Sequence, residues 1–471
     1  MTDGRPLLAE LAAFATGLRE QPPPAPVMAD VRRRVRDVVG NALAAGGAEP
    51  AGIALALAEE MGGAHEATPF IGNRKLPAAS AALVNGTLAH ALDFDDTHLP
   101  SILHPSACVV PAAMAVAERL GLGGEDLCVA VVAGDEICIR LGMAGYDAEL
   151  GNSVFFERGL HATSICGTLG AAAAVAYLMG LDETGTGHAM AIAASMGAGL
   201  LEANRTGGSV KQVHCGWAAH AGIVAADLAR LGLTGPPTVL EGRFGFLQAY
   251  LDDRAHPGAL TDGLGSDWLI AQTSFKPYPA NHFTHAVIDC ALRLRQTLQA
   301  DEIERVEIGV AAPVLRTIAE PEAQKARPPS GYAAKFSGPY TFAAAFLGGG
   351  GLGVYLDDFT DEAAADPRRL ELAARVHFRP DDECSAVYPR QFPAVARVEL
   401  RNGERREVKA LVNRGGPQSP LSDAELTTKF RLNAARRLSE GRVEQLDDLL
   451  GHLAELDSVA SLVSLCRMDA A

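Results

Sequence analysis

The sequence predicts a two-domain protein: a large all-helical domain, built from the N-terminal part and the C-terminal helices, with an α+β domain inserted between them. Three observations predict this fold. Up to about residue 250, runs rich in Ala, Leu and Val alternate with short Gly or Pro breaks, as helices do. After residue 302 the hydrophobic period becomes two, which is a strand signal, and after residue 421 the helical period returns. We place the domains at 1–271, 272–420 and 421–471.

The helical runs of the first domain surround a polar block. We expect helices at 78–91, 107–120, 165–178, 187–203 and 217–231. Pro100 and Pro105 separate the first two helices, because proline lacks the backbone donor that a helix interior needs. Ser106 is then placed to cap the second helix.

The second domain shows strand periodicity in four segments, at 306–311, 374–379, 396–401 and 407–412. Asn402-Gly403, between the last two segments, is a strong signal for a hairpin turn. Two helical segments follow, at 422–438 and 443–465. Ser422 and Glu425 have the spacing of a capping box at the start of the first. We expect these helices to pack back on the first domain.

Composition favours an enzyme over a nucleic-acid or membrane protein. The 471 residues are 48% hydrophobic and 21% charged, so the chain can bury a large core, and the net charge of −16 argues against a nucleic-acid partner. Apolar runs end before the ~18 residues of a membrane span, and the N-terminus does not resemble a signal peptide. We expect a cytoplasmic protein. Eight cysteines without a Cys-x-x-Cys pair predict reduced, packed thiols rather than zinc or disulfides.

The most informative stretch is Asn85 to Ser106. An apolar helix delivers Asp93, Asp95 and Asp96 to its C-terminal end, where the helix dipole disfavours negative charge. Buried carboxylates are costly, so cations must compensate them. His104 lies just before the next helix, whose N-terminus favours an anion. A solvated structural loop is the alternative interpretation.

A metal site is the second alternative for this stretch. Asp93, Asp95, Asp96 and His98 would suffice in number, but the sequence lacks another Asp/His cluster at ligand spacing. Phosphate-cradling glycine loops are also missing. We therefore expect neither a metal nor an organic cofactor. His90 faces a helix interior and His98 a loop, so we expect both to support the fold.

Lysine usage gives an independent indication. Only seven of the 41 basic residues are lysines, and two of them, Lys211 and Lys276, lie in motifs, Lys-Gln-Val-His and Lys-Pro-Tyr-Pro. An ammonium group acts as a point charge for a carboxylate and shifts its pKa when buried, which arginine rarely does. Gly207 and Gly208 would let the backbone approach a ligand before Lys211. The alternative is that both are exposed loop lysines.

Six segments together resemble one enzyme family over nearly the whole chain. They are Asn85 to Ser106; Gly159-Leu-His-Ala-Thr with Gly167-Thr-Leu-Gly; Lys211 to His220; Lys276-Pro-Tyr-Pro-Ala-Asn; Phe336-Ser-Gly-Pro-Tyr; and Pro417 to Ser422 with Lys429-Phe430. The chain is identified as a member of the MmgE/PrpD family, which contains 2-methylcitrate dehydratase, cis-aconitate decarboxylase and iminodisuccinate epimerase.

The resemblance implies a cofactor-independent lyase for a small di- or tricarboxylate. Its chemistry is a proton transfer at a carbon next to a carboxylate, which needs a positioned acid or base and stabilising cations. The implied catalytic residues are His104, for proton transfer at carbon; His161, for the leaving hydroxyl or a neighbouring carboxylate; and Lys211 and Lys276, for substrate carboxylates. The implied substrate-binding residues are Asp93 and Thr97, which orient and balance the cations; His214, a contact or supporting group; and Tyr340, from the α+β domain acting as a lid. His220, His282 and His285 accompany the lysine motifs.

The family includes several reactions. A hydro-lyase (dehydratase) acting on a 2-methylcitrate-like or citrate-like acid is our leading expectation, because it is the commonest. The alternatives are a decarboxylase of a cis-aconitate-like acid; an epimerase or isomerase, with Tyr146 as second base; and an inactive member that serves as a binding protein. The spacing from Thr97 to His104 is one residue longer than in the decarboxylase branch. The resemblance also implies a homodimer through the helical domain.

Overall fold

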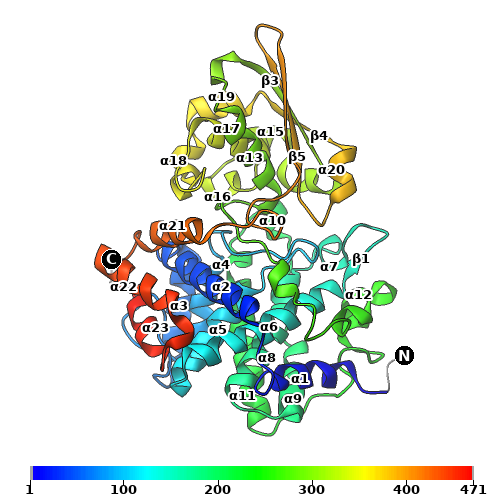
Figure 1. Ribbon diagram of the computed structural model, residues 1–471, viewed down its shortest axis with the longest axis vertical. Helices are drawn as coiled ribbons and strands as arrows, with labels where there is room; N and C mark the ends of the chain where they lie inside the picture. Colours follow the sequence, from blue (N-terminus) through cyan, green and yellow to red (C-terminus); the bar gives the residue numbers. More distant parts are fainter. Residues whose placement is uncertain (1–3, 469–471) are drawn as a thin grey trace. The chain divides into compact units, whose positions relative to one another are not determined.

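The computed structural model describes residues 4–468, which form two compact units (Figure 1). The helical unit contains the chain up to Thr273 and again from Phe430, and the inserted unit is Ser274–Lys429. Most residues are helical and one small mixed sheet is present, which agrees with the predicted helical two-domain fold.

Helix α21 (Asp423–Ala434) begins in the inserted unit and ends in the helical unit. The other helices and strands of the helical unit have these bounds: α1 (Leu7–Gly17), α2 (Ala25–Ala44), α3 (Glu49–Met61), α4 (Ala78–His90), α5 (Ser106–Leu120), α6 (Gly124–Met143), β1 (Tyr146–Asp147), β2 (Asn152–Ser153), α7 (Val154–Glu157), α8 (Ala162–Leu178), α9 (Glu183–Ala194), α10 (Ala203–Thr206), α11 (Val210–Arg230), α12 (Phe246–Leu251), α22 (Glu440–Gly451) and α23 (Ala460–Cys466). Helices were predicted at the places of α4, α5, α8, α11 and α21, and all five predictions are confirmed.

Helix α8 lies at the centre of the helical unit. Every one of its residues is buried, as expected for a helix that is apolar on all faces. It packs against α5, α6, α9 and α11. The two segments that begin with candidate histidines, 104 and 161, therefore lead directly into α5 and α8 in the core.

Two predicted helices are shorter than expected. The segment 187–203 stays helical only to the end of α9 at Ala194. Beyond it, Gly199 accepts a hydrogen bond from the His161 backbone nitrogen at 3.0 Å, and Leu200 forms an antiparallel bridge with Leu160. The prediction of one helix was wrong because this segment pairs with the chain that carries His161. The segment 443–465 is likewise divided into α22 and α23. Its break lets Leu456 accept a hydrogen bond from the backbone of Gly124.

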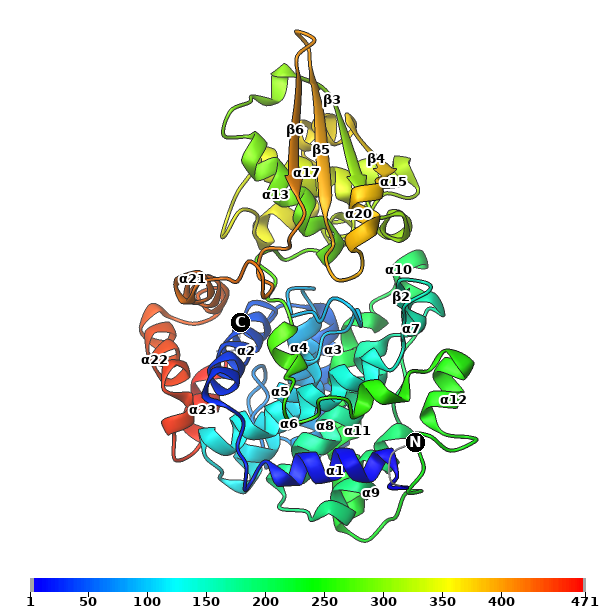
Figure 2. The same ribbon diagram turned by 45° about the vertical axis from the view of Figure 1, so that its right-hand side comes forward.

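The inserted unit contains a four-stranded sheet in the order β4-β3-β5-β6, with β3 and β4 parallel and the other neighbours antiparallel. Helix α13 packs on β5 and β6, and α17 packs on β4 (Figure 2). The bounds are α13 (His285–Leu294), β3 (Ile303–Val310), α14 (Leu315–Ile318), α15 (Glu322–Ala326), α16 (Gly331–Ala334), α17 (Gly338–Leu347), α18 (Asp361–Ala364), α19 (Pro367–Ala373), β4 (Val376–Pro380), α20 (Asp382–Val387), β5 (Ala394–Leu400) and β6 (Arg405–Ala410).

All four predicted strands are confirmed in this unit. The predicted hairpin also forms: Leu400 donates to the Glu404 carbonyl at 2.8 Å, and Gly403 has a φ of 84°. The capping box is present too, because Ser422 Oγ accepts from the Glu425 backbone and Glu425 Oε2 accepts from the Ser422 backbone.

All eight cysteines are buried and free, as predicted. Among residues 4–468, no helix is long and apolar enough to span a membrane.

Helices α4 and α11 approach each other closely where two glycines meet. A Cβ on Gly86 would lie 2.8 Å from the Gly216 Cα, and a Cβ on Gly216 would lie 2.2 Å from the Leu83 carbonyl oxygen. One turn beyond Gly86, the same contact brings His90 beside Lys211, whose Nζ is 3.3 Å from His90 Nε2. The close approach therefore positions the site described below.

We expect Gly216→Ala to lower the free energy of unfolding by about 1–3 kcal/mol, because the added methyl forces α4 and α11 apart. Chemical denaturation measures it. The matched control is Gly441→Ala in α22, where a Cβ meets nothing within 4 Å and should leave stability unchanged or higher. Equal stability of both variants would contradict the close approach.

Candidate active site

The loop between α4 and α5 carries three buried carboxylates, and each has a basic side chain as its partner. Asp93 Oδ1 lies 3.7 Å from Lys211 Nζ, Asp95 Oδ2 lies 2.7 Å from His90 Nδ1, and Asp96 Oδ2 lies 2.8 Å from Arg34 NH1. Basic groups therefore lie next to these carboxylates, as expected. Asp93 also has a φ of 54°, in the left-handed region that few non-glycine residues adopt. The partners come from α2, α4 and α11, so three helices fix this loop.

Ser106 does not cap α5, contrary to the prediction. Its hydroxyl lies between two carboxylates instead, 2.6 Å from Asp96 Oδ2 and 2.8 Å from Asp135 Oδ2. A hydroxyl has one proton, so it donates to one of the two groups and accepts from the other, which must then be a protonated carboxyl group. Burial raises the pKa of Asp135 well above its usual range, whereas Arg34 opposes the rise at Asp96. We conclude that Asp135 holds the proton and that Asp96 is the ionised partner of Arg34.

His104 is held in one tautomer by the same loop. Its Nδ1 lies 2.6 Å from the Asp96 carbonyl oxygen and 3.2 Å from Thr97 Oγ1. A carbonyl oxygen can only accept, so Nδ1 carries the hydrogen and Nε2 is the nitrogen left for proton transfer. The imidazole is also 13% exposed, unlike its buried neighbours. The longer spacing after Thr97 therefore still presents a usable ring nitrogen.

His161 precedes α8 and pairs with His214 from α11. Their Nδ1 atoms are 2.8 Å apart, so one ring donates and the other accepts. Burial, with the nearby charges of Lys211 and His90, holds the pKa of His161 well below its usual value. Burial and the same charges lower the pKa of His214 to about 4. Both rings are therefore neutral at physiological pH.

His90 lies in the middle of this group. Its ring centroid is 5.3 Å from that of His104 and 5.6 Å from that of His161, and its Nε2 contacts Lys211. The structure thus brings together six of the predicted residues in the helical unit, namely Asp93, Thr97, His104, His161, Lys211 and His214. From sequence, we expected only a supporting role for His90, and Arg34 was not among the candidate residues. His90 is the last residue of α4, directly before the loop with the carboxylates, and this position could have identified it as a site residue.

The other two predicted residues belong to the inserted unit. Lys276 lies in the segment that begins this unit and is 1% exposed. Tyr340 lies on α17, where its hydroxyl donates to the Asp358 carbonyl at 2.7 Å and accepts from Arg369 at 3.0 Å. Tyr340 is thus bonded within its own unit. Their roles toward a substrate stay predictions.

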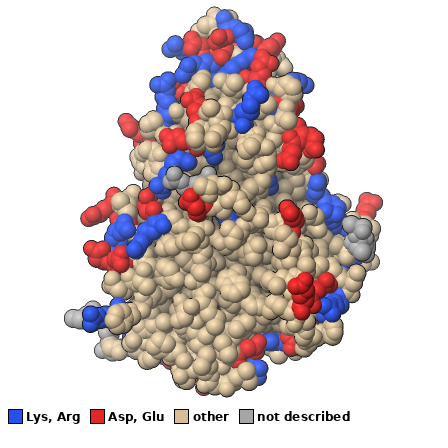
Figure 3. Space-filling model, turned by 180° about the vertical axis from the view of Figure 1, so that it is seen from behind, with Lys and Arg blue, Asp and Glu red and all other residues tan. Residues whose placement is uncertain are grey.

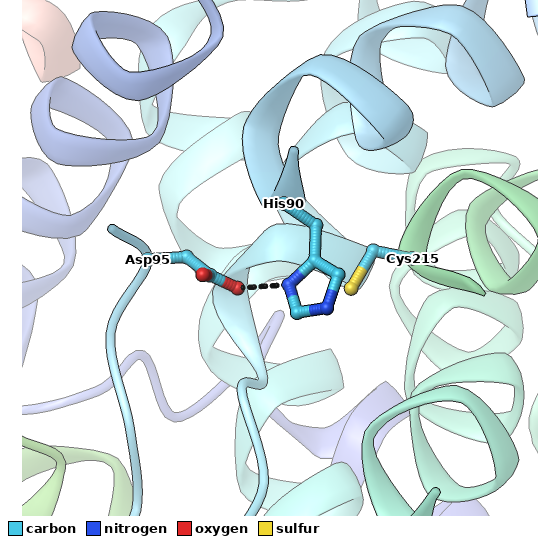
Figure 4. Close-up of side chains that lie close together, drawn as sticks. All are labelled: His90, Asp95 and Cys215. Atoms are coloured by element: carbon cyan, nitrogen blue, oxygen red, sulfur yellow. Dashed lines mark hydrogen bonds and ion pairs between the residues drawn. The ribbon is translucent and has the colours of Figure 1, made fainter. Parts of the chain in front are cut away.

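His90, Asp95 and Cys215 have potential metal-ligating atoms within 4.8 Å of one another (Figure 4). Burial raises the pKa of Cys215, but hydrogen bonds from Cys108 and His90 bring it down to about 7. The 2.7 Å between His90 Nδ1 and Asp95 is a hydrogen-bond distance, and Nε2 lies beside the Lys211 amine. A divalent cation would meet that amine, so this donor set fits a hydrogen-bond chain better than a ligand shell.

The four residues considered from sequence as possible metal ligands, Asp93, Asp95, Asp96 and His98, contact different protein groups. The three carboxylates contact Lys211, His90 and Arg34, and His98 Nδ1 contacts Ser101 Oγ at 2.8 Å. Burial, with the Arg34 charge, lowers the pKa of His98 to about 3. His98 is therefore a neutral supporting residue, as expected.

We expect His98 to destabilise the fold on acidification. In the folded protein His98 stays neutral down to about pH 3, whereas in the unfolded chain it becomes protonated below pH ~6.5. Its contribution to the free energy of unfolding is therefore fully present above pH ~6.5 and is lost as pH falls toward 3. Between pH 7 and pH 5 this amounts to about 2 kcal/mol. Urea unfolding of wild type and His98→Gln at both pH values measures it: the variant should lose less stability, and equal losses would refute the assignment.

Comparison with known proteins supports the predicted family. The sequence model of the MmgE/PrpD N-terminal domain matches residues 9–257, and that of the MmgE/PrpD C-terminal domain matches residues 278–453. The cis-aconitate decarboxylase of Homo sapiens is 33% identical over 83% of this chain and 80% of its own length. That of Mus musculus is 31% identical over 83% and 79%, and that of Aspergillus terreus is 26% identical over 83% and 82%.

These relatives confirm the predicted enzyme class, because a decarboxylase is a lyase. They favour the decarboxylase alternative over the hydro-lyase that was our leading expectation. The two domain matches cover most of the chain in the expected order. The chain therefore belongs to the MmgE/PrpD family.

Proposed function

We propose that this enzyme decarboxylates an unsaturated tricarboxylate of the cis-aconitate class, using its own side chains and no metal or organic cofactor. The observation that carries the proposal is the gathering of His104, His161 and Lys211 around one buried loop of the helical unit. The names of the relatives supply the substrate class.

The reaction moves electrons along three carbons. In cis-aconitate, one carboxylate is attached to a CH₂ group that is next to the double bond. Breaking its C–C bond releases CO₂, and the electron pair left behind forms a new terminal double bond. The former double-bond pair takes a proton at the carbon beside another carboxylate. Negative charge grows on that carboxylate in the transition state, so a cation next to it and a proton donor at the carbon lower the barrier.

The side chains of the helical unit suit these tasks. Lys211 binds the carboxylate on which charge grows, and Asp93, 3.7 Å away, orients the ammonium group. His104 first takes up a proton at Nε2 and then, as an imidazolium, delivers that proton to the substrate carbon, with Thr97 and the Asp96 carbonyl fixing the ring through Nδ1. His161 is neutral, and when its Nδ1 accepts from His214 its Nε2–H donates a hydrogen bond to a further substrate carboxylate. In this proposal His214 orients His161.

Two residues of the inserted unit also have roles in this proposal. Lys276 binds a substrate carboxylate with its ammonium group, and Tyr340 contacts the substrate. Lys276 is one of only seven lysines and is nearly fully buried, which supports a chemical role over that of a solvated loop residue. Lys276→Met should then raise KM for the substrate more than Lys409→Met, which removes an exposed ammonium from the sheet.

Proton NMR of the purified enzyme in D₂O tests the reaction class. The panel is cis-aconitate, citrate, 2-methylcitrate and an amino-dicarboxylic acid. We expect cis-aconitate to lose CO₂ and give a product with a terminal methylene group. Loss of water from a hydroxy acid would instead support the hydro-lyase, deuterium exchange alone would support an epimerase, and no reaction would support a binding protein.

We expect activity to survive metal removal. The proposed steps use ammonium and imidazole groups, and the carboxylates of the loop already have protein partners. Extended dialysis against EDTA, followed by assay in metal-free buffer, should leave turnover unchanged. Activity that vanished and returned only with a divalent ion would require His90, Asp95 and Cys215 to be reinterpreted as ligands.

We also propose a homodimer that associates through the helical unit. Apolar side chains are exposed at one-turn spacing on α3, at Ile53, Leu57 and Met61, and Trp217 on α11 is 45% exposed. One broad face of the helical unit carries few charged residues (Figure 3). Such surfaces mark protein interfaces. Light scattering should give twice the chain mass, whereas a monomer at micromolar concentration would contradict the proposal.

We also propose a cytoplasmic location. The eight free thiols support it, because free thiols are typical of a reducing compartment.

A further inference from the structure

His90 connects two charged groups of the site. Its Nδ1 lies 2.7 Å from Asp95 Oδ2, and its Nε2 lies 3.3 Å from Lys211 Nζ. All three residues are buried. Lys211 in turn contacts Asp93 at 3.7 Å. The result is a chain of alternating acidic and basic groups, in which His90 links one of the proposed substrate-binding cations to a buried carboxylate.

Counting hydrogens in this chain gives a definite charge. The Asp95 carboxylate can only accept, so His90 Nδ1 carries a hydrogen. The contact between Nε2 and Nζ needs a hydrogen on one nitrogen and a lone pair on the other. The pair is therefore either neutral imidazole with ammonium or imidazolium with neutral amine, and each arrangement has one positive charge. Two full charges at this distance, away from water, would repel strongly.

The surrounding groups keep the two nitrogens in competition for that proton. Burial and the neighbouring Lys211 disfavour protonation of His90, whereas Asp95 raises the pKa of the ring above its usual value, so the imidazole and the amine compete for the proton. The other titratable groups that face His90 are His104 from the loop, His161 at α8, His214 and Cys215 on α11, and Cys108 on α5, which bonds to Cys215. Among these, His161 and His214 are neutral.

We propose that the His90–Lys211 pair holds one positive charge in the free enzyme and takes up a second proton when a substrate carboxylate binds to Lys211, which makes His90 a positioning residue for proton-linked substrate binding. This inference rests on the proposed function. The arriving carboxylate supplies the negative charge that offsets the repulsion, so both nitrogens become fully protonated. Lys211 then presents a complete ammonium group to the substrate, and Asp95 balances the imidazolium.

Calorimetry with propane-1,2,3-tricarboxylate tests the inference. This saturated tricarboxylate has no double bond and cannot undergo the reaction. Titrations at pH 8, in buffers of different ionisation enthalpy, give the number of protons taken up per bound ligand. We expect about one proton for the wild type, and a Kd that rises about tenfold per pH unit above neutrality. Binding without proton uptake would overturn the inference while leaving the proposed function intact. No binding at all would count against the proposed function itself.

Variants assign the proton to His90. His90→Gln has no titratable ring. The number of protons taken up per bound ligand should therefore fall, and Kd should depend less steeply on pH. The matched control is His220→Asn. His220 also joins α11 to α4, through a 3.0 Å contact with the Ala79 carbonyl, and it lies outside the site, so proton uptake should stay at the wild-type value.

Two further outcomes keep the assignment falsifiable. If His90→Gln keeps the full proton uptake and His161→Asn abolishes it, the proton goes to His161 and the inference is wrong. If His90→Gln does not fold, Asp95→Asn replaces it. Removing the carboxylate that supports the imidazolium should reduce the uptake in the same way, and unchanged uptake would contradict the proposal.

Discussion

His104→Ala should lower turnover by ~10² to 10⁴-fold while leaving the melting temperature nearly unchanged. The ring is held through Nδ1 by the Asp96 carbonyl oxygen and is partly exposed, so its loss removes the proton donor and little packing. His452→Ala is the control. It removes an exposed histidine from the same unit and should keep full activity. A folded His104→Ala variant with wild-type turnover would remove His104 from the mechanism.

Lys211→Ala should reduce turnover as much, but it is the less clean test. Lys211 contacts both Asp93 and His90, so its removal leaves the buried Asp93 carboxylate without this cation. This variant should therefore also lower the melting temperature, because a buried charge that loses its partner destabilises the fold.

Arg34→Met should lower the free energy of unfolding by about 3–5 kcal/mol. Arg34 is fully buried, pairs with Asp96 and Asp30, and donates to the carbonyl oxygens of Ile270 and Thr273. Its loss would leave Asp96 as an uncompensated buried charge close to the proposed proton donor. Urea denaturation at pH 7 measures the effect.

The double variant Arg34→Met/Asp96→Asn is the matched control. It removes both charges of the pair, so it should recover much of the lost stability even though the guanidinium contacts to Ile270 and Thr273 are gone. A single variant that costs less than about 1 kcal/mol, or a double variant no more stable than the single, would contradict this account of the buried pair.

The sequence was sufficient for much of the fold because its signals are local. Period-two segments correspond to β3 to β6, and Asn402-Gly403 to the hairpin between β5 and β6. The two shortened helices were not predictable in this way. The segment after α9 leaves the helix to pair with residues near His161, and the break before α23 bonds to residues near Gly124. Such long-range hydrogen bonds leave no pattern within the segment itself.

The same distinction applies to the site. The polar block after α4 predicted that its carboxylates need cations, and Lys211 was identified by the rarity of lysine. Arg34 could not be identified, because it lies 62 residues from Asp96 among many similar arginines. Asp135 is one of two adjacent buried acidic residues in α6, and only the shared Ser106 hydroxyl distinguishes it as the protonated one. Which residue contacts each carboxylate depends on how α2, α4 and α6 pack together, and this packing cannot be predicted from the spacing of residues within one segment.

In the proposed reaction the substrate loses one carboxylate as CO₂ and gains one proton at a different carbon, and side chains of this chain carry out both steps. The most direct test is to incubate cis-aconitate with the enzyme in D₂O and to analyse the product by proton and carbon NMR. We expect one CO₂ per product molecule and a single deuteron on the methylene carbon beside a carboxylate, with the product formed at least ~10²-fold more slowly by His104→Ala than by wild type. A product that keeps all of its carbon atoms, or one formed at the same rate without His104, would contradict it.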